Sequence, residues 1–327
     1  MDDRVARFLV VALCAAMFLV ACSGSQPTPG GSPRPSPSAS RSLPVAGAVA
    51  GRVDVEGNAD GLAFGEGSLW VGHYGGNVVE RIDPVTGTVT ARVQVGDRPI
   101  AVLPTGRAVW VANYSSNSVS RIDPETNQVV ATIDVGVGPQ GVTVVDGVVW
   151  VTNTIDGGLS LIDGRTSKVV GSVPFDGSPG FAEEGFGDVW VPDFEGDTLF
   201  RYDARKRKAE ATITVGARPL SVAVGGGSVW VTNYGDGTVS RIDPKTNGVV
   251  ATIALPGQQP QGITVGAGAV WASSIRDRVV ARIDPATNRV VGVIQVGGGP
   301  RDVVVVDGAL WVAEFDQGMV ARVDLAD

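Results

Sequence analysis

The sequence has little of the chemistry that metal centres and disulfide scaffolds need. One His and two Cys in 327 residues exclude His-rich zinc sites, thiolate metal clusters and a disulfide framework. Aromatic residues make up only 6% of the chain, and a formal net charge of −8 argues against a nucleic-acid-binding face. Gly, by contrast, is abundant, with 45 residues, and together with many Val and Thr it is typical of short strands joined by tight turns. With 43% hydrophobic residues, the chain is too apolar to be disordered.

Long apolar runs are absent except near the N-terminus. Phe8 to Ala21 is an unbroken run of 14 apolar residues, shorter than the roughly 20 that a membrane-spanning helix needs. The run follows Arg4 and Arg7, and its ending, Leu19-Val20-Ala21-Cys22, resembles the bacterial lipobox. The resemblance implies a signal peptide at residues 1–21, a diacylglyceryl group on Cys22, and an extracytoplasmic protein anchored to the bacterial cell membrane. An ordinary secretory signal with an incidental cysteine is the alternative.

Residues 22–46 have the composition of a linker. Sixteen of the 24 residues from Ser23 to Ala46 are Ser, Pro or Gly. Such a segment buries too little apolar surface to offset its ordering entropy. We therefore expect a disordered tether between the lipidated cysteine and a domain at residues 47–327.

Seven repeats occupy that domain. A Trp recurs every 40 or 41 residues, and an Asp follows each Trp by thirteen. The tryptophans are Trp70, Trp110, Trp150, Trp190, Trp230, Trp271 and Trp311. The aspartates are Asp83, Asp123, Asp163, Asp203, Asp243, Asp284 and Asp324. Residues 47–327 number 281, seven times forty plus one residue inserted before Pro260. This period and composition predict an all-β propeller with seven four-stranded blades.

The repeat at residues 217–254 shows the expected blade. We expect strands at 220–224, 229–233, 238–243 and 249–254. The Asp that ends the third strand should bond the backbone of its own turn, and the Arg two residues earlier should form a solvated ion pair with it. The last repeat stops after its third strand, whereas residues 50–56 have strand composition and no strand before them. We therefore expect this first strand to complete the last blade and close the ring.

The repeat unit resembles a known group of propellers. Its pattern P-x-G-(V/I)-x-V, followed by (L/V)-W-V-x-N-Y, occurs for example at Pro139–Val144 and Trp230–Tyr234, and it is similar to YVTN-repeat and virginiamycin B lyase-like propellers. The resemblance covers the 281 residues after the tether and implies the fold, but it says little about activity, because such propellers include enzymes, binding proteins and scaffolds. One YVTN-repeat relative binds single-stranded DNA, whereas 22 basic against 32 acidic residues in this propeller argue against nucleic acid.

The first strand of each blade begins, and the second ends, at the same mouth of the central channel. Residues at this mouth do not have to follow the consensus of the blades, because the fold does not depend on them. Differences between blades at these positions therefore indicate a ligand-binding site. The predicted ligand-binding residues are Asp60, His73, Arg98, Asn113, Asn153, Glu184, Asp193, Arg218, Asn233, Arg301 and Glu314. A polar funnel with an aromatic rim suits a small molecule, a peptide or an envelope protein. For the asparagines, hydrogen bonds to turn amides are the alternative explanation.

Glu184 stands where every other blade has Phe, Pro or Val. A carboxylate at an apolar position marks either function or a local change of register, and desolvation there would raise its pKa. We expect Glu184 to contribute to the ligand-binding channel, with a register shift in its blade as the alternative.

An enzymatic role is the alternative function. Virginiamycin B lyase repeats have histidines ten residues before the Trp, acids three after it, and a bound Mg²⁺. Here no repeat has His at the first position, only Asp193 and Glu314 are acidic at the second, and His73 stands where that family has its acid. Gluconolactonase-like propellers hold a divalent cation with oxygen ligands. The candidates for such ligands are Asp60, Asn113, Asn153, Asp193, Asn233 and Glu314. The sequence favours a monomeric binding protein with no assigned catalytic residue, and it leaves open a divalent cation with lyase or lactonase activity.

Overall fold

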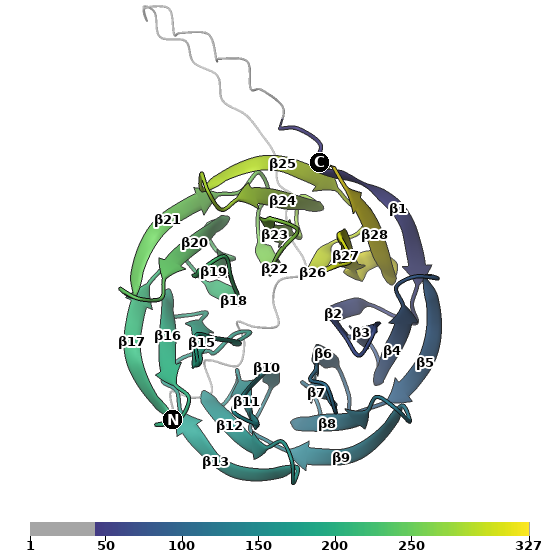
Figure 1. Cartoon of the computed structure of the whole chain (residues 1–327). Coiled ribbons are helices and arrows are strands. Elements are labelled where there is room, and N and C mark those ends of the chain that lie inside the picture. The colour runs from purple at the N-terminus through teal and green to yellow at the C-terminus, as the bar shows by residue number, and fades with distance from the viewer. Residues whose placement is uncertain (1–42, 327) are drawn as a thin grey trace, which may run out of the picture. The chain divides into compact units, whose positions relative to one another are not determined.

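A computed structural model describes residues 43–326, in which 28 strands form seven four-stranded antiparallel sheets arranged as the blades of a ring (Figure 1). The predicted signal peptide, Cys22 and the tether up to residue 42 lie outside the described residues. Within residues 43–326, no helix has the length and apolar character needed to cross a membrane.

Four consecutive strands pair in order in blades 1 to 6. Blade 1 has β2 (Ala59–Gly65), β3 (Ser68–His73), β4 (Val78–Asp83) and β5 (Thr88–Gln94). Blade 2 has β6 (Pro99–Pro104), β7 (Val109–Asn113), β8 (Ser118–Asp123) and β9 (Gln128–Asp134). Blade 3 has β10 (Pro139–Val145), β11 (Val148–Asn153), β12 (Gly158–Asp163) and β13 (Lys168–Pro174). Blade 4 has β14 (Glu183–Gly185), β15 (Asp188–Asp193), β16 (Thr198–Asp203) and β17 (Lys208–Thr214).

Blades 5 and 6 follow the same order, and blade 7 has β1, the first strand of the chain, as its outermost strand. Blade 5 has β18 (Pro219–Gly225), β19 (Ser228–Asn233), β20 (Thr238–Asp243) and β21 (Gly248–Ala254). Blade 6 has β22 (Pro260–Gly266), β23 (Ala269–Ser274), β24 (Val279–Asp284) and β25 (Arg289–Gln295). Blade 7 has β26 (Pro300–Val306), β27 (Ala309–Glu314), the short 3₁₀ turn η2 (Phe315–Gln317), β28 (Met319–Leu325) and β1 (Gly47–Asp54).

The strand order gives the ring two faces. In each blade the first strand is innermost and the fourth outermost (Figure 1). The start of β18 pairs with the end of β19, Pro219 with Asn233, so the loops that enter first strands and the loops that leave second strands share one face. We call it the loop face. The opposite face, which carries the hairpins between first and second strands and between third and fourth strands, is the turn face.

The hydrophobic core lies between neighbouring blades. Trp70 of blade 1 packs with Val102 and Val111 of blade 2, and six further clusters of buried side chains repeat this arrangement around the ring. In four blades the Trp Nε1–H also donates to the carbonyl oxygen of a Gly five residues earlier, at 3.0–3.2 Å. Because each blade buries its apolar surface only against its neighbours, the ring has to be closed to be stable.

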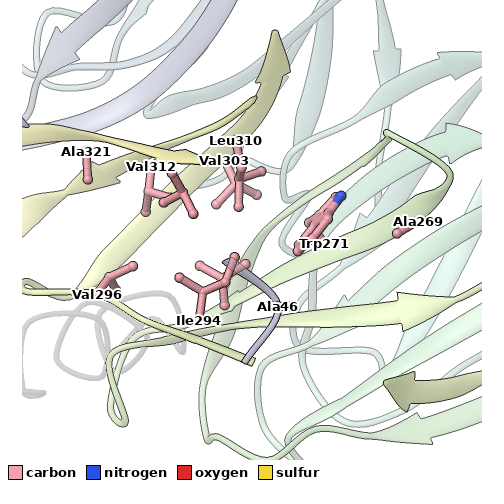
Figure 2. Close-up of a cluster of buried hydrophobic side chains, with 11 residues drawn as sticks. Ala46, Ala269, Trp271, Ile294, Val296, Val303, Leu310, Val312 and Ala321 are labelled. Carbon is pink, nitrogen blue, oxygen red and sulfur yellow. The ribbon is translucent and has the colours of Figure 1, made fainter. Parts of the chain in front are cut away.

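The predicted closure is confirmed. β1 pairs antiparallel with β28, and Val53 lies opposite Val320. β1 starts at Gly47, three residues before the expected strand, and the preceding Ala46 donates its N–H to the carbonyl oxygen of Val293 at 2.9 Å. Ala46 belongs to the core cluster shared by blades 6 and 7, beside Ile294 (Figure 2). The inserted residue also lies where it was expected, in the loop at residues 255–259 between β21 and β22.

The Arg of the third strand contacts the next blade, so the prediction of Arg–Asp pairs within one strand is wrong in most blades. Arg81 donates from Nη1 to the carbonyl oxygen of Pro124 at 2.7 Å and to Asn127 Oδ1 at 3.0 Å, and blades 4 and 5 repeat both bonds. The Asp is already occupied: Asp83 Oδ1 accepts the N–H of Val85 at 2.8 Å, as predicted for a turn aspartate. These backbone hydrogen bonds lower the pKa of Asp83.

Replacing Arg241 by Lys should therefore weaken the contact between blades 5 and 6. Arg241 holds the carbonyl oxygen of Pro285 at 2.6 Å and Asn288 Oδ1 at 2.8 Å, and a Lys ammonium cannot reproduce the planar fork. We expect Arg241→Lys to lower the free energy of unfolding by about 2 kcal/mol in denaturant titrations. The matched control is Arg322→Lys: among residues 43–326, Arg322 pairs only with exposed Asp324, at 3.4 Å, so the change should alter stability by less than about 0.5 kcal/mol. Equal losses in the two variants would contradict the prediction.

Candidate functional site

The predicted asparagines end the second strands and point into their own blades. Asn113 donates from Nδ2 to the hydroxyl groups of Ser118 and Ser120 at 3.1 and 2.9 Å. Asn153 and Asn233 make equivalent bonds, at 2.8–2.9 Å, to hydroxyl groups of their third strands. The asparagine side chains therefore bond hydroxyl groups of the third strands, and not the turn amides of the alternative explanation.

A loop glycine covers each of these asparagines. A Cβ atom on Gly96 would lie 2.6 Å from Asn113 Cγ, and Gly136 and Gly216 approach Asn153 and Asn233 as closely. All three asparagines are buried. Their role in ligand binding stays a prediction.

The two acids at the same strand position are also held inside their blades. Glu314 has a side chain with no exposed surface, and it accepts hydrogen bonds from Arg52 Nε at 2.8 Å and from the N–H of Gly297 at 2.7 Å. Asp193 is buried and accepts the N–H of Ser178 at 2.9 Å. The candidate cation ligands thus lie in separate blades, and within residues 43–326 no three His, Cys, Asp or Glu side chains are grouped to hold a metal ion.

His73, the single histidine, is buried in blade 1. Its Nε2 lies 3.5 Å from Glu80 Oε2, and Arg92 donates from Nε to the other oxygen of Glu80 at 2.6 Å. Burial by itself would raise the pKa of Glu80, but the hydrogen bonds and charges of His73 and Arg92 outweigh it and lower that pKa. His73 therefore faces the buried Glu80 carboxylate within blade 1, and the partly exposed Arg92 pairs with the same carboxylate.

The arginines of the loop face lie against aromatic rings. Arg98 lies over the ring of Tyr74, with its guanidinium carbon 4.4 Å from the ring centre, and 5.7 Å from the ring centre of Tyr114. Arg301 lies 4.2 Å from the ring centre of Phe315, which in turn makes an edge contact with Tyr74 at 5.4 Å. These five side chains, from blades 7, 1 and 2, form a continuous cluster that we call the rim.

A second, smaller unit repeats this arrangement between blades 4 and 5. Arg218 lies 5.5 Å from the ring centre of Phe194, and Phe194 contacts Tyr234 at 5.9 Å. A hollow of about 450 Å³ opens here, lined by residues that include Phe194, Glu195, Asp197 and Arg218. Both arginine–aromatic units lie on the loop face, where the sequence predicted these arginines and an aromatic rim, and their role in ligand binding stays a prediction.

Asp60 lies at the start of the innermost strand β2, beneath the rim. It is 4% exposed, and burial raises its pKa to about 6 in spite of the opposing charges of Arg301 and Arg98. The charges of Arg98 and Arg301 thus act on Asp60, so these three predicted residues belong to the same part of the loop face.

Two further carboxylates of the innermost strands were missed. Asp302 accepts the N–H of Leu62 at 3.0 Å, and burial raises its pKa to about 7. Glu183 has its pKa raised to about 8, first by burial and then by the charges of Glu184 and Asp302. The sequence could have revealed both carboxylates. Asp302 and Glu183 are each the one charged residue at their position among the seven repeats.

Glu184 itself is half-buried. Its N–H donates to Thr143 Oγ1 at 3.0 Å, and its Oε1 accepts the N–H of Gly187 at 3.4 Å. The alternative of a register shift is wrong, because Glu183 pairs with Trp190 as Ala223 pairs with Trp230 in blade 5. The channel role of Glu184 stays a prediction.

Fold and site together define a seven-bladed all-β propeller whose loop face combines arginine, aromatic and buried carboxylate side chains. No family model matches the sequence, and no curated protein matches it. Among solved structures, the chain is similar to hydrazine synthase from Kuenenia stuttgartiensis, with 18% identity, a TM-score of 0.74, and coverage of 84% of this chain and 97% of that one. It is also similar to a catalytically inactive virginiamycin B lyase from Staphylococcus aureus with quinupristin, with 15% identity, a TM-score of 0.75, and coverage of 84% and 99%. At these identities the likeness shows the propeller fold alone.

Proposed function

We propose that this protein is an exported, lipid-anchored propeller that binds a small molecule, a peptide or an envelope protein at its channel mouth. The lipobox-like ending at Cys22 supports the anchor. The observation that carries the binding proposal is the rim, where the guanidinium carbons of Arg98 and Arg301 lie 4.4 and 4.2 Å from the ring centres of Tyr74 and Phe315. The backbone of Arg98 is left-handed, with a φ of 56°, and the matching residues Arg218 and Gln259 have φ values of 52° and 58°. This conformation therefore belongs to the loop in several blades, and a substitution of Arg98 has to tolerate it.

The rim has the chemistry to recognise a polar ligand. Aromatic faces hold a guanidinium in place without using its N–H groups. Arg301 Nη1 donates to Gln261 Oε1 at 3.1 Å, and the remaining N–H groups of Arg301 and those of Arg98 can donate to a carboxylate or a carbonyl group of a ligand. Asp60 can accept a hydrogen bond from an amine or a hydroxyl group beside them. Tyr74, Tyr114 and Phe315 offer apolar surface to the rest of the ligand. Small-molecule binding sites are usually lined by apolar and aromatic side chains with a few polar groups among them.

The test starts from the full chain purified from membranes. Native mass spectrometry would identify molecules that co-purify, a thermal-shift panel would add further ligands, and the intact mass would report whether Cys22 carries lipid. For the ligand found, Arg98→Asn should raise Kd at least about tenfold, because the loss of a charged hydrogen bond costs about 1.5–3 kcal/mol. Asn is chosen because it tolerates the left-handed backbone conformation.

The matched control is Arg276→Asn, which removes the same charge from an exposed arginine on the loop face of blade 6. Its Kd should equal that of the unchanged protein. The proposal fails if no ligand is found, or if the ligand binds Arg98→Asn as tightly as it binds the control.

A further inference from the structure

The turn face of blades 3, 4 and 5 concentrates positive charge. The five residues that follow the Asp of the third strand are 164–168, 204–208 and 244–248 in these blades, and together they contain seven cations and no acid. The matching residues of blades 1, 2 and 6 (84–88, 124–128 and 285–289) contain one cation and one acid. We call the seven cations, which include all four lysines of the chain, the basic arc: Arg165, Lys168, Arg205, Lys206, Arg207, Lys208 and Lys245.

Most of the basic arc is not neutralised by internal ion pairs. All seven residues are exposed. Arg205 Nε lies 3.1 Å from Asp146 Oδ2, and Lys206 Nζ lies 2.7 and 2.8 Å from carboxylate oxygens of Asp203 and Glu210. The other five cations have no carboxylate within 4.0 Å in the described part of the chain. In a protein of net charge −8, this arc is a local surplus of positive charge.

An exposed aromatic side chain lies within the basic arc. Phe186 is 50% exposed and occupies a hairpin position with a φ of 60°. The other blades have small or acidic residues there: Glu66, Gly106, Asp146, Gly226, Ala267 and Asp307. Phe186 also lines a hollow of about 540 Å³ together with Pro244 and Lys245 of blade 5. Neither burial nor backbone preference accounts for a Phe at this position.

We propose that the turn face of blades 3–5 docks on an anionic lipid bilayer, with the basic arc on the head groups and Phe186 inserted between them. Basic clusters are attracted to anionic leaflets, and aromatic side chains favour the boundary between head groups and acyl chains. A soluble anionic polymer could bind to the cations of the basic arc, but it has no apolar region for the exposed ring of Phe186 to enter. Phe186 therefore favours a membrane over a polymer.

The path of the chain agrees with this orientation. Gly47 lies beside Leu325, and Ala326 donates its N–H to the carbonyl oxygen of Ala46 at 3.0 Å, at the end of β28 that belongs to the turn face. The segment leading to the predicted lipid on Cys22 thus joins the propeller on the same face as the basic arc. Docking through this face would point the rim away from the membrane, toward ligands outside.

Vesicle binding tests the proposal without the lipid anchor. Residues 43–327 form one compact unit with all seven blades and the closing strand, and they lack Cys22. We expect this segment to co-sediment with vesicles of phosphatidylglycerol and phosphatidylcholine, but not with vesicles of phosphatidylcholine alone. Binding should be lost in about 1 M salt, where the screening length falls to about 3 Å. Phe186→Asn should weaken binding roughly tenfold while the circular dichroism spectrum stays unchanged.

A matched pair of charge reversals locates the contact. Lys208 and Arg289 are both first residues of fourth strands, in blades 4 and 6. Lys208→Glu should weaken vesicle binding roughly tenfold, whereas Arg289→Glu should leave it unchanged. Equal effects of the two reversals would overturn the proposal, and so would a lack of binding to the anionic vesicles. Binding to soluble polyglutamate as tight as to the vesicles, unaffected by Phe186→Asn, would replace the membrane with an anionic polymer and also overturn it. None of these outcomes depends on the ligand site at the rim.

Discussion

Replacing Arg52 by Ala should lower the free energy of unfolding by about 3 kcal/mol, because it leaves Glu314 buried without its cation. Arg52 Nε lies 2.8 Å from Glu314 Oε2, and the Glu314 side chain has no exposed surface. Within the described part of the chain, only the N–H of Gly297, at 2.7 Å, would then still donate to the carboxylate. The loss falls on β1, the strand that closes the ring, so it should affect the cooperative unfolding of the whole propeller.

Equilibrium denaturation in urea would measure the effect. The double variant Arg52→Met with Glu314→Gln removes both charges and should recover most of the stability. Arg322→Ala is the control, because it removes an exposed arginine from β28, the neighbouring strand of the same blade. If Arg52→Ala cost no more than this control, the pair would not secure the closure.

The repeats predicted the propeller because its stabilising contacts recur with the sequence period. Each Trp fills the same space between two blades, so seven tryptophans 40 or 41 residues apart are enough to count the blades. Closure was predictable for a related reason: one strand was missing from the last repeat and one was spare before the first. Both inferences concern the backbone and the number of strands.

Contacts between side chains of different blades were harder to predict. Arg81 and Asp83 share one face of a strand, which suggested an ion pair, yet the Arg reaches oxygen atoms of Pro124 and Asn127 more than 40 residues away. A pattern within one strand does not reveal which partner satisfies a long side chain. The Pro and Asn that recur in the turn of the next repeat, such as Pro124 and Asn127, would have indicated the partners of the Arg.

The directions of the side chains on the loop face also could not be predicted from the sequence pattern. β3 and β19 are buried at every position, because neighbouring blades cover both of their faces. Alternation of polar and apolar residues, the usual guide to side-chain direction in a strand, is therefore missing. Asn233 ends β19 at the loop face, and the pattern could not show that its side chain bonds inside its own blade. Arg98 and Arg218 lie in loops, and their guanidinium groups lie beside aromatic rings.

Acidification from pH 8 to pH 5 should stabilise the propeller. The pKa values of Glu183, Asp302 and Asp60 are raised to about 8, 7 and 6, chiefly by burial. Between the unfolded values near 4 and these folded values, the folded state holds protons that the unfolded state releases. The free energy of unfolding therefore falls as the pH rises through this window, and it levels off only above about pH 9, roughly one unit beyond the highest folded value.

Glu183→Gln should remove the largest share of this dependence, because its pKa is the most strongly raised. We expect a loss of roughly 2–4 kcal/mol between pH 5 and pH 8 in the unchanged protein, less than the three shifts summed, because the carboxylates act on one another. Urea titrations at each pH would measure it. Asp83→Asn is the control: its pKa is lowered, so it titrates below the window and should leave the slope unaltered. A Glu183→Gln slope equal to that of the unchanged protein would show that the channel does not hold this carboxyl group protonated. Water reaching Glu183 freely would then be the physical reason, and the innermost strands would line an open, polar channel.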